Sequence, residues 1–246
     1  MKDRRNWLKA NWDELEAQGS DQQRRVAYPP LEQPCPADAE LIDLPPVNEL
    51  ELGTMPLAET IAKRESRRKW SEEPVGFSDL VWLLWATQGI RSVPASGAAT
   101  LRTVPSGGAR HAFETYLAAQ HVDGLEPGLY RYLALSHQLA RLRLQADIGE
   151  QTGQAMRNQR TVSRAPLTFV WSTVPYRAEW RYGVAAHKMI AIDAGHVCQN
   201  LYLGCEALGL GCCAIGAYDQ KLVDQLIGVD GEDELAIYAC AVGRPV

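Results

Sequence analysis

The stretch "RTVPSGGARHAFETY", Arg102 to Tyr116, places two adjacent glycines after a Pro-Ser pair and before residues that are typical of a strand. Glycine has no Cβ, so the backbone at such a position can come close to a flat or anionic ligand. Arg102 and Ser106 supply hydrogen-bond donors beside the loop. Taken alone, the stretch fits three structures: a phosphate site, a site for a redox cofactor, and an ordinary turn before a strand.

The composition is that of an ordinary globular protein. Of the 246 residues, 46% are hydrophobic and 22% are charged, and the chain is long enough to bury a sizeable core. The net charge of -5 argues against general nucleic-acid binding. No apolar run is long enough to span a bilayer, and the charged opening stretch lacks the apolar core of a secretory signal. We therefore expect a cytoplasmic protein with no nucleic-acid or membrane partner.

Helices and strands are mixed without strict βαβ alternation, which predicts an α+β fold. We expect an N-terminal helix and a proline-rich extended arm over residues 1–50, followed by one domain over residues 51–246. Predicted helices cover residues 57–70, 76–90 (with Ser78 as N-cap and Gly89 as the stop), 147–161 (capped by Asp147), 184–208 and 219–229. Predicted strands cover residues 114–122, a hairpin over 124–144 around Pro127-Gly128, and 165–174, 211–218 and 234–245.

Six cysteines stand at positions 35, 198, 205, 212, 213 and 240, without a Cys-x-x-Cys pair or a finger-like histidine spacing. Cys198, Cys205 and Cys212 recur every seven residues, which would bring the first two to one helix face and leaves a thiolate metal site open. Buried free thiols behave as small hydrophobes, and we favour that interpretation. No metal site is predicted.

Two further stretches, one rich in positive charge and one rich in glycine, each fit two alternative roles. "KRESRRKW", Lys63 to Trp70, is either a solvated helix end or a phosphate clamp, because guanidinium groups bind phosphate oxygens bidentately. "LGLGCCAIGAYD", Leu208 to Asp219, is either a glycine cap before a core strand or a backbone that approaches a ligand. None of the three stretches is a P-loop or a dinucleotide fingerprint.

In their order along the chain, these stretches resemble the FMN-dependent nitroreductase family. "RESRRKW" is similar to its Arg-Arg-Ser-x-Arg-x-Phe motif, although Glu65 replaces the second Arg. "PSGGARHAFETY" resembles the form found in the SagB-like dehydrogenase (azoline oxidase-like) branch. "PGLYRYLALSHQL", "DAGHVCQNLYLGCEALGLGCCAIGAYD" and the terminal "AVGRP" match the same branch, so that the resemblance covers roughly residues 56–246.

The resemblance implies a nitroreductase-like fold, with a central, mostly antiparallel sheet flanked by helices, and an intertwined homodimer with FMN at the subunit interface. NAD(P)H is a candidate electron donor, although no fingerprint requires it. Gly216 would direct a backbone N–H toward flavin N5. The residues carried over to the cofactor site are Arg64, Ser66, Arg68, Arg102, Pro105, Ser106, Gly107, Gly108, Ala214, Ile215, Gly216 and Arg244.

The same resemblance identifies candidate catalytic residues. Azoline-oxidising members carry a Lys-Tyr pair, and here Arg181 replaces the lysine while Tyr182 is retained. Arginine stays protonated, so Arg181 cannot be a general base but could hold an anion. Tyr182 is either an acid or a buried phenol whose hydroxyl is satisfied. His111, beside the glycine loop, is the candidate for a substrate-facing residue.

Asp193, His196 and Asn200 share one face of the predicted helix 184–208. They form either a metal or catalytic site or a hydrogen-bonded seam, and we favour the seam because further metal ligands are missing. Ala191, Ala194, Gly195 and Gly204 on this helix are small enough to allow close packing against another helix.

We therefore expect an FMN-dependent oxidoreductase that transfers a hydride through flavin N5. Its substrate would be a heterocycle of a modified peptide, or a nitro or quinone compound. The alternative is an accessory or scaffold protein of a biosynthetic complex that lacks azoline oxidase activity, which the replacement of the lysine by Arg181 motivates. Nucleic-acid binding through Lys63–Lys69 is disfavoured by the acidic net charge.

Overall fold

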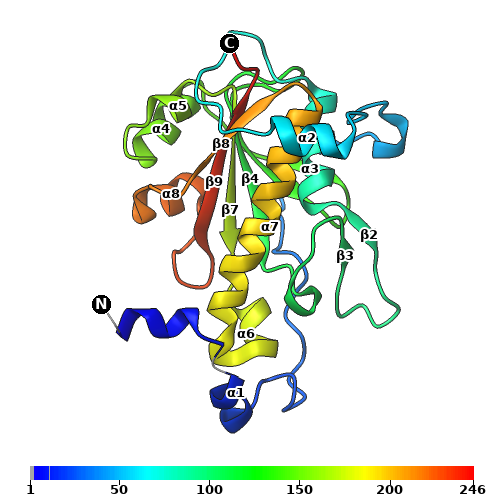
Figure 1. Ribbon diagram of the computed structural model, residues 1–246, viewed down its shortest axis with the longest axis vertical. Helices are drawn as coiled ribbons and strands as arrows, with labels where there is room; N and C mark the ends of the chain where they lie inside the picture. Colours follow the sequence, from blue (N-terminus) through cyan, green and yellow to red (C-terminus); the bar gives the residue numbers. More distant parts are fainter. Residues whose placement is uncertain (1–2, 11) are drawn as a thin grey trace.

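The computed structural model describes residues 3–10 and 12–246, which form an α+β fold around one large sheet (Figure 1). Over these residues the sheet has seven strands in the order β1-β6-β5-β4-β7-β9-β8, and every neighbouring pair is antiparallel. The predicted central antiparallel sheet is therefore confirmed. A separate ribbon pairs β2 with β3.

The strands are β1 (Glu40–Asp43), β2 (Ile90–Ser92), β3 (Leu101–Arg102), β4 (Phe113–Ala119), β5 (Gly128–Leu133), β6 (Gln138–Leu144), β7 (Leu167–Thr173), β8 (Gly211–Ile215) and β9 (Leu235–Gly243). The α-helices are α1 (Trp12–Gln18), α2 (Leu57–Lys63), α3 (Phe77–Gln88), α4 (Ile148–Ala155), α5 (Arg160–Ser163), α6 (Tyr176–Tyr182), α7 (Ala186–Ala207) and α8 (Gln220–Ile227). Short 3-10 turns are η1 (Asp3–Leu8), η2 (Val47–Glu49), η3 (Gly107–Ala109) and η4 (Gly183–Ala185).

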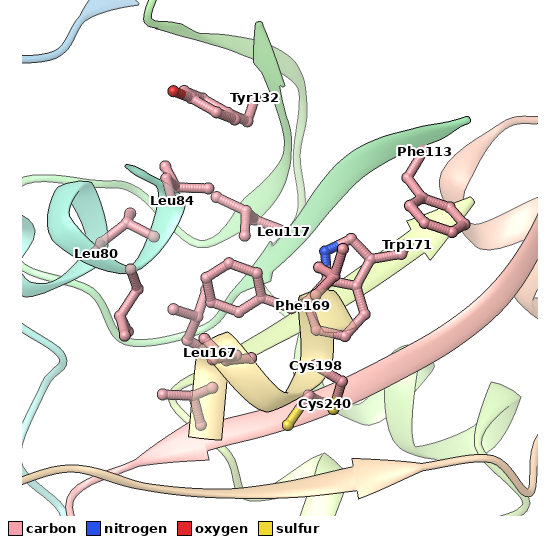
Figure 2. Close-up of a cluster of buried hydrophobic side chains, with 14 of the residues drawn as sticks. Leu80, Leu84, Phe113, Leu117, Tyr132, Leu167, Phe169, Trp171, Cys198 and Cys240 are labelled. Atoms are coloured by element: carbon pink, nitrogen blue, oxygen red, sulfur yellow. The ribbon is translucent and has the colours of Figure 1, made fainter. Parts of the chain in front are cut away.

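Helices cover both faces of the sheet, because successive side chains of a strand point to opposite faces. On β7, Phe169 and Trp171 enter the core beneath α3 and α7, whereas Val170 enters the core beneath α4 and α8. Figure 2 shows Phe169 and Trp171 packed between Leu80 of α3 and Cys198 of α7. All residues of β7 are buried, so the predicted buried strand is confirmed.

The helix that we predicted over residues 57–70 ends at Lys63, so the solvated-helix-end interpretation of Lys63–Trp70 is wrong. Residues 64–70 are extended along the outer edge of β8. The Arg67 N–H donates to the Cys212 carbonyl at 3.0 Å, and Ser66 forms a parallel bridge with Cys212. The open edge of β8 thus gives these residues backbone hydrogen-bond partners. These partners favour the extended conformation over a helix end exposed to water.

Two smaller predictions are corrected. Ser78 is not an N-cap, because α3 begins at Phe77 and Gly76 precedes it, although the predicted stop at Gly89 is confirmed. The predicted hairpin is β5–β6, but its turn lies at residues 134–137 rather than at Pro127-Gly128. His137 adopts φ +54° there, a conformation that sequence patterns signal reliably only for glycine or asparagine.

The proline-rich segment lies along the sheet before it becomes the edge strand β1. Its backbone carbonyls at Pro30, Gln33 and Pro34 accept hydrogen bonds from the buried guanidinium groups of Arg177 and Arg131. Charges of this kind are buried only when they are paired and hydrogen-bonded, and the arm supplies part of that pairing. The domain boundary at residue 50 stays a prediction.

All six cysteines are free, and only Cys35 among them is not buried. Within the described chain, no helix combines the length and the apolar character that crossing a bilayer requires.

Candidate functional site

The glycine loop is held by an acid on α7. The Ser106 hydroxyl donates to Asp193 Oδ2 at 2.7 Å, and the Gly107 N–H donates to the same carboxylate at 3.0 Å. The Ser106 Oγ in turn accepts the His111 N–H at 2.9 Å. Burial raises the pKa of Asp193, while the hydrogen bonds from Ser106 and Gly107 oppose that rise. Asp193 is therefore an anchor of the loop.

The loop is strained in a way that requires glycine at one position. Gly108, Ala109 and His111 have φ values of +56°, +54° and +43°. A Cβ built on Gly108 would lie 2.5 Å from Arg181 Nε and 2.6 Å from the Tyr182 hydroxyl oxygen. Positive φ costs a residue with a Cβ about 1–2 kcal/mol. Strain of this size is typical of functional loops held by their surroundings.

The contact at Gly108 brings the glycine loop to both predicted catalytic residues. Arg181 and Tyr182 end α6, and the Arg181 guanidinium lies over the Tyr182 ring, 5.6 Å from its centroid. Arg110 stacks on Trp180 at 5.2 Å. Burial, followed by the positive charge of Arg181, lowers the pKa of Arg110. The loop therefore faces two guanidinium groups, which suit an anionic or electron-rich partner.

His111 and Arg102 lie behind this loop, inside the chain. The His111 side chain is only 4% exposed, and burial together with Arg102 and Arg110 lowers its pKa to about 3, so that the imidazole is neutral at neutral pH. Arg102 donates to Thr100 Oγ1 at 3.0 Å and to Gln88 Oε1 at 2.8 Å. Burial lowers its pKa to about 10 although Glu114 opposes the shift. The roles given to His111 and Arg102 stay predictions.

A second group of predicted residues gathers at β8 around Tyr202 of α7. The Tyr202 hydroxyl accepts the Ala214 N–H at 2.9 Å and lies 2.9 Å from Ser66 Oγ. Arg64 lies over the Tyr202 ring, 5.4 Å from its centroid. Gly216 is exposed, and a Cβ built there would meet no atom within 4 Å. The backbone at the end of β8 therefore faces open space beside a cationic side chain.

Arg68 and Arg244 lie nearer the start of β8: Ser66 and Arg67 pair with Cys212, and Arg244 follows Gly243, the partner of Gly211. The Arg68 guanidinium donates to the Ser66 carbonyl at 3.3 Å, and Arg244 forms an ion pair with Glu73 at 2.8 Å. Sequence reasoning missed Tyr202, because nothing in its spacing connects it to Ser66, 136 residues earlier.

The predicted residues thus form two half-sites. The glycine-loop half-site comprises Pro105–Gly108, Arg181 and Tyr182; the arginine half-site comprises Arg64, Ser66, Arg68, Ala214–Gly216 and Arg244. Asp193 anchors the first and Tyr202 the second. Nine residues of α-helix separate these two anchors by about 13 Å along the axis and by about 180° around it. The two half-sites therefore lie on opposite sides of α7.

Two of the three residues in the polar stripe on α7 form the hydrogen bonds that we favoured. Asp193 binds the glycine loop, and the Asn200 amide donates to the Ala86 carbonyl of α3 at 2.8 Å. His196 Nδ1 lies 3.7 Å from Asp193 Oδ1. In the part of the chain that the structure describes, no three His, Cys, Asp or Glu side chains are grouped as metal ligands.

Fold and site together define an α+β oxidoreductase in which a long helix carries a strained glycine loop on one side and an arginine cluster on the other. The chain matches the nitroreductase family model over residues 61–244, and it belongs to that family of flavoproteins. The expected nitroreductase-like fold and enzyme class are confirmed.

Two curated relatives share this similarity. MJ1384 of Methanocaldococcus jannaschii, named as a nitroreductase, is 27% identical over 209 residues, which cover 85% of this chain and 98% of its own. The trifolitoxin-processing protein TfxB of Rhizobium leguminosarum bv. trifolii is 27% identical over 158 residues, which cover 61% of this chain but only 41% of its own.

Solved structures give the same fold. A protein of Ralstonia eutropha JMP134 described as a nitroreductase superposes with a TM-score of 0.69 and 28% identity, over 90% of this chain and 99% of its own. One from Anabaena variabilis gives 0.66 and 27%, over 77% of this chain and 38% of its own. A chain of the Escherichia coli microcin synthetase McbBCD complex shares the fold at 15% identity, with a TM-score of 0.63 over 95% of this chain and 91% of its own.

Proposed function

We propose that this protein is an FMN-dependent oxidoreductase of the SagB-like branch, in which FMN lies between two copies of the chain. The observation that carries this proposal is the placement of the two half-sites on opposite sides of α7. Helix α7 itself stands between them, so one cofactor cannot reach both within a single chain. A second copy would bring its glycine-loop half-site to the arginine half-site of the first.

The surface around α7 supports an association of two copies. Ala191 and Gly195 are exposed, and a Cβ built on Gly195 would meet no atom within 4 Å, which leaves room for a close helix. Ile192 on α7 is 42% exposed, while Leu57 and Ile61 on α2 are 66% and 57% exposed. Exposed apolar side chains on α7 and on α2, which packs against α7, favour a protein interface.

The residues present fit FMN. Its phosphate carries a charge of about -2, like that of a phosphorylated side chain, and needs fixed cationic donors. Arg64, Arg68 and Arg244 would bind that phosphate or the ribityl chain, with the Ser66 hydroxyl as a further donor. Gly216 would present its N–H in open space. When bound, FMN supplies the hydride chemistry, and NAD(P)H would be the electron donor.

Arg181 and Tyr182 would act on the substrate side. Arg181 keeps its proton, so it would orient an anionic or carbonyl group and not remove a proton. Among the described residues, none forms a hydrogen bond with the Tyr182 hydroxyl. Tyr182 is only half-buried, so its hydroxyl is available to act as an acid.

The similarity to TfxB, which is named as a trifolitoxin-processing protein, supports a heterocycle of a modified peptide as substrate. Arg181 in place of the lysine weakens that choice, and a nitro or quinone compound is the second candidate. A scaffold protein without azoline oxidase activity is the remaining alternative.

The test is the visible spectrum of the purified protein, before and after anaerobic addition of NAD(P)H. We expect flavin bands that bleach. Arg64→Ala and Arg68→Ala should each weaken FMN binding about tenfold or more, since each removes a charge-assisted contact. Arg141→Ala on β6, near the opposite edge of the sheet from β8, should not. Absence of flavin even after FMN is added would refute the proposal.

A further inference from the structure

An N-terminal segment, residues 12–26, lies across α6 at one end of the molecule, as Figure 1 shows for α1 and α6. Two hydrogen bonds join its backbone to Trp180 of that helix. The Gln22 N–H donates to the Trp180 carbonyl at 2.8 Å, and the Trp180 indole N–H donates to the Val26 carbonyl at 2.9 Å. The Tyr176 hydroxyl donates to Asp21 Oδ2 at 2.9 Å. We call residues 12–26 the strap.

The strap also touches both candidate catalytic residues. The Trp12 ring meets the Tyr182 ring edge-on, with 5.8 Å between centroids and 78° between planes. The Arg181 guanidinium donates to Gln22 Oε1 at 3.2 Å. Leu15 is buried beside Gly183, where a built Cβ would lie 3.1 Å from Leu15 Cδ1. The side chains opposite the glycine loop are thus held from behind.

The contacts of Gln22 and Trp12 are of a kind that can hold Arg181 and Tyr182 in position. Gln22 offers a neutral oxygen, which orients the guanidinium without cancelling its charge, whereas a carboxylate would neutralise it. Asp21, the neighbouring carboxylate, is turned to Tyr176 instead. The edge of Trp12 carries partial positive charge and prefers the face or edge of a second ring in a fixed tilt, so it limits the rotation of Tyr182.

We propose that the strap forms a wall of the active site, in which Trp12 positions Tyr182 and Gln22 positions Arg181 against the glycine loop. The strap lies outside residues 61–244, the part of the chain that matches the family, so the family match does not assign it this role. The proposal rests on the function proposed above for Arg181 and Tyr182.

The test compares Trp12→Ala and Gln22→Ala with matched controls on the same segment or next to it. Trp7→Ala removes an exposed tryptophan, and Gln18→Ala removes an exposed glutamine that bonds only to Glu14 through its side-chain amide. Full-length proteins loaded with FMN are reduced chemically, and their anaerobic reoxidation by the quinone menadione is followed. We expect both strap variants to retain FMN and to reoxidise about tenfold more slowly, because small displacements of positioning groups cost this much or more.

A double-mutant cycle separates positioning from mere stability. In a Tyr182→Phe background, which keeps the ring but lacks the hydroxyl, Trp12→Ala should cause no further loss of rate. Additive losses would overturn the proposal. So would strap variants that reoxidise as fast as Trp7→Ala and Gln18→Ala.

Hydrogen exchange in the FMN-free protein gives a readout that does not depend on turnover. Residues 176–183 should exchange faster in both strap variants and not in the controls. Faster exchange with unchanged reoxidation would show that the strap only stabilises α6, and it would overturn the proposal while leaving the proposed function intact. A wild-type protein that binds no FMN would overturn both.

Discussion

Replacing Gly108 by alanine should damage the site more than the fold. An alanine at φ +56° costs about 1–2 kcal/mol. The new Cβ would also overlap Arg181 Nε at 2.5 Å and the Tyr182 hydroxyl at 2.6 Å. Both neighbours are flexible side-chain ends, so they move aside at about 0.5–1.5 kcal/mol. We therefore expect a total loss of about 1.5–3.5 kcal/mol, or roughly 3–14 °C in Tm for a chain of this length.

Gly124→Ala is the matched control. Gly124 has φ +75°, and a Cβ there would meet no atom within 4 Å, so this variant carries the backbone cost without the contact. Thermal unfolding followed by circular dichroism should show both variants destabilised, Gly108→Ala somewhat more. Steady-state turnover of an FMN-loaded enzyme should fall about tenfold to a hundredfold for Gly108→Ala and stay near wild type for Gly124→Ala. Equal turnover in the two variants would refute the reasoning.

Three other predictions concern buried groups. Asp193→Ala removes the acceptor of two loop donors and should cost about 1–3 kcal/mol in denaturant unfolding, with a loss of bound flavin. Glu114→Gln should cost about 3–5 kcal/mol, because it leaves Arg177 uncompensated where both side chains are 3% exposed, and Glu114→Gln with Arg177→Met should recover much of that loss. The pKa of His111 is lowered to about 3, so the unfolded chain binds a proton below pH 6.5 that the folded chain does not, and stability falls as the pH falls. Between pH 7 and pH 5 the free energy of unfolding, measured with urea, should fall by about 1–2 kcal/mol more in wild type than in His111→Asn. An equal fall in the two proteins would contradict this assignment.

Strand and helix positions were predictable where the chain carries a strong periodic or apolar signal. The continuous run over 165–174 became the fully buried β7, and the long helix predicted over 184–208 became α7. Gly89 caps α3, as predicted, and a Cβ there would lie 2.6 Å from the Trp85 carbonyl oxygen, so the position favours glycine. The helix predicted over residues 64–70 was wrong because local propensity carries no information about distant strand edges. The edge that Ser66 joins is at Cys212, 146 residues further along the chain.

The site was predictable from motif order, but its geometry was not. The resemblance identified Ser106 and Tyr182 as site residues. It did not reveal that Asp193 accepts a hydrogen bond from Ser106 or that Trp12 packs on Tyr182. Such contacts join residues that are far apart in the sequence, and a single sequence carries no record of them. Tyr202 was not predicted for the same reason, because its contact is with the distant Ser66.

Both edges of the sheet are protected, one by a short charged strand and the other by a segment that runs beside it. At one edge β1 is only four residues long and carries Glu40 and Asp43, and at the other the extended residues after α2 run beside β8. Short, charged or covered edges resist the addition of a foreign strand, the step that begins edge-to-edge aggregation. Trimming the chain to its family-matched part would uncover the longer strand β6, so we expect the trimmed protein to aggregate more readily than the whole chain.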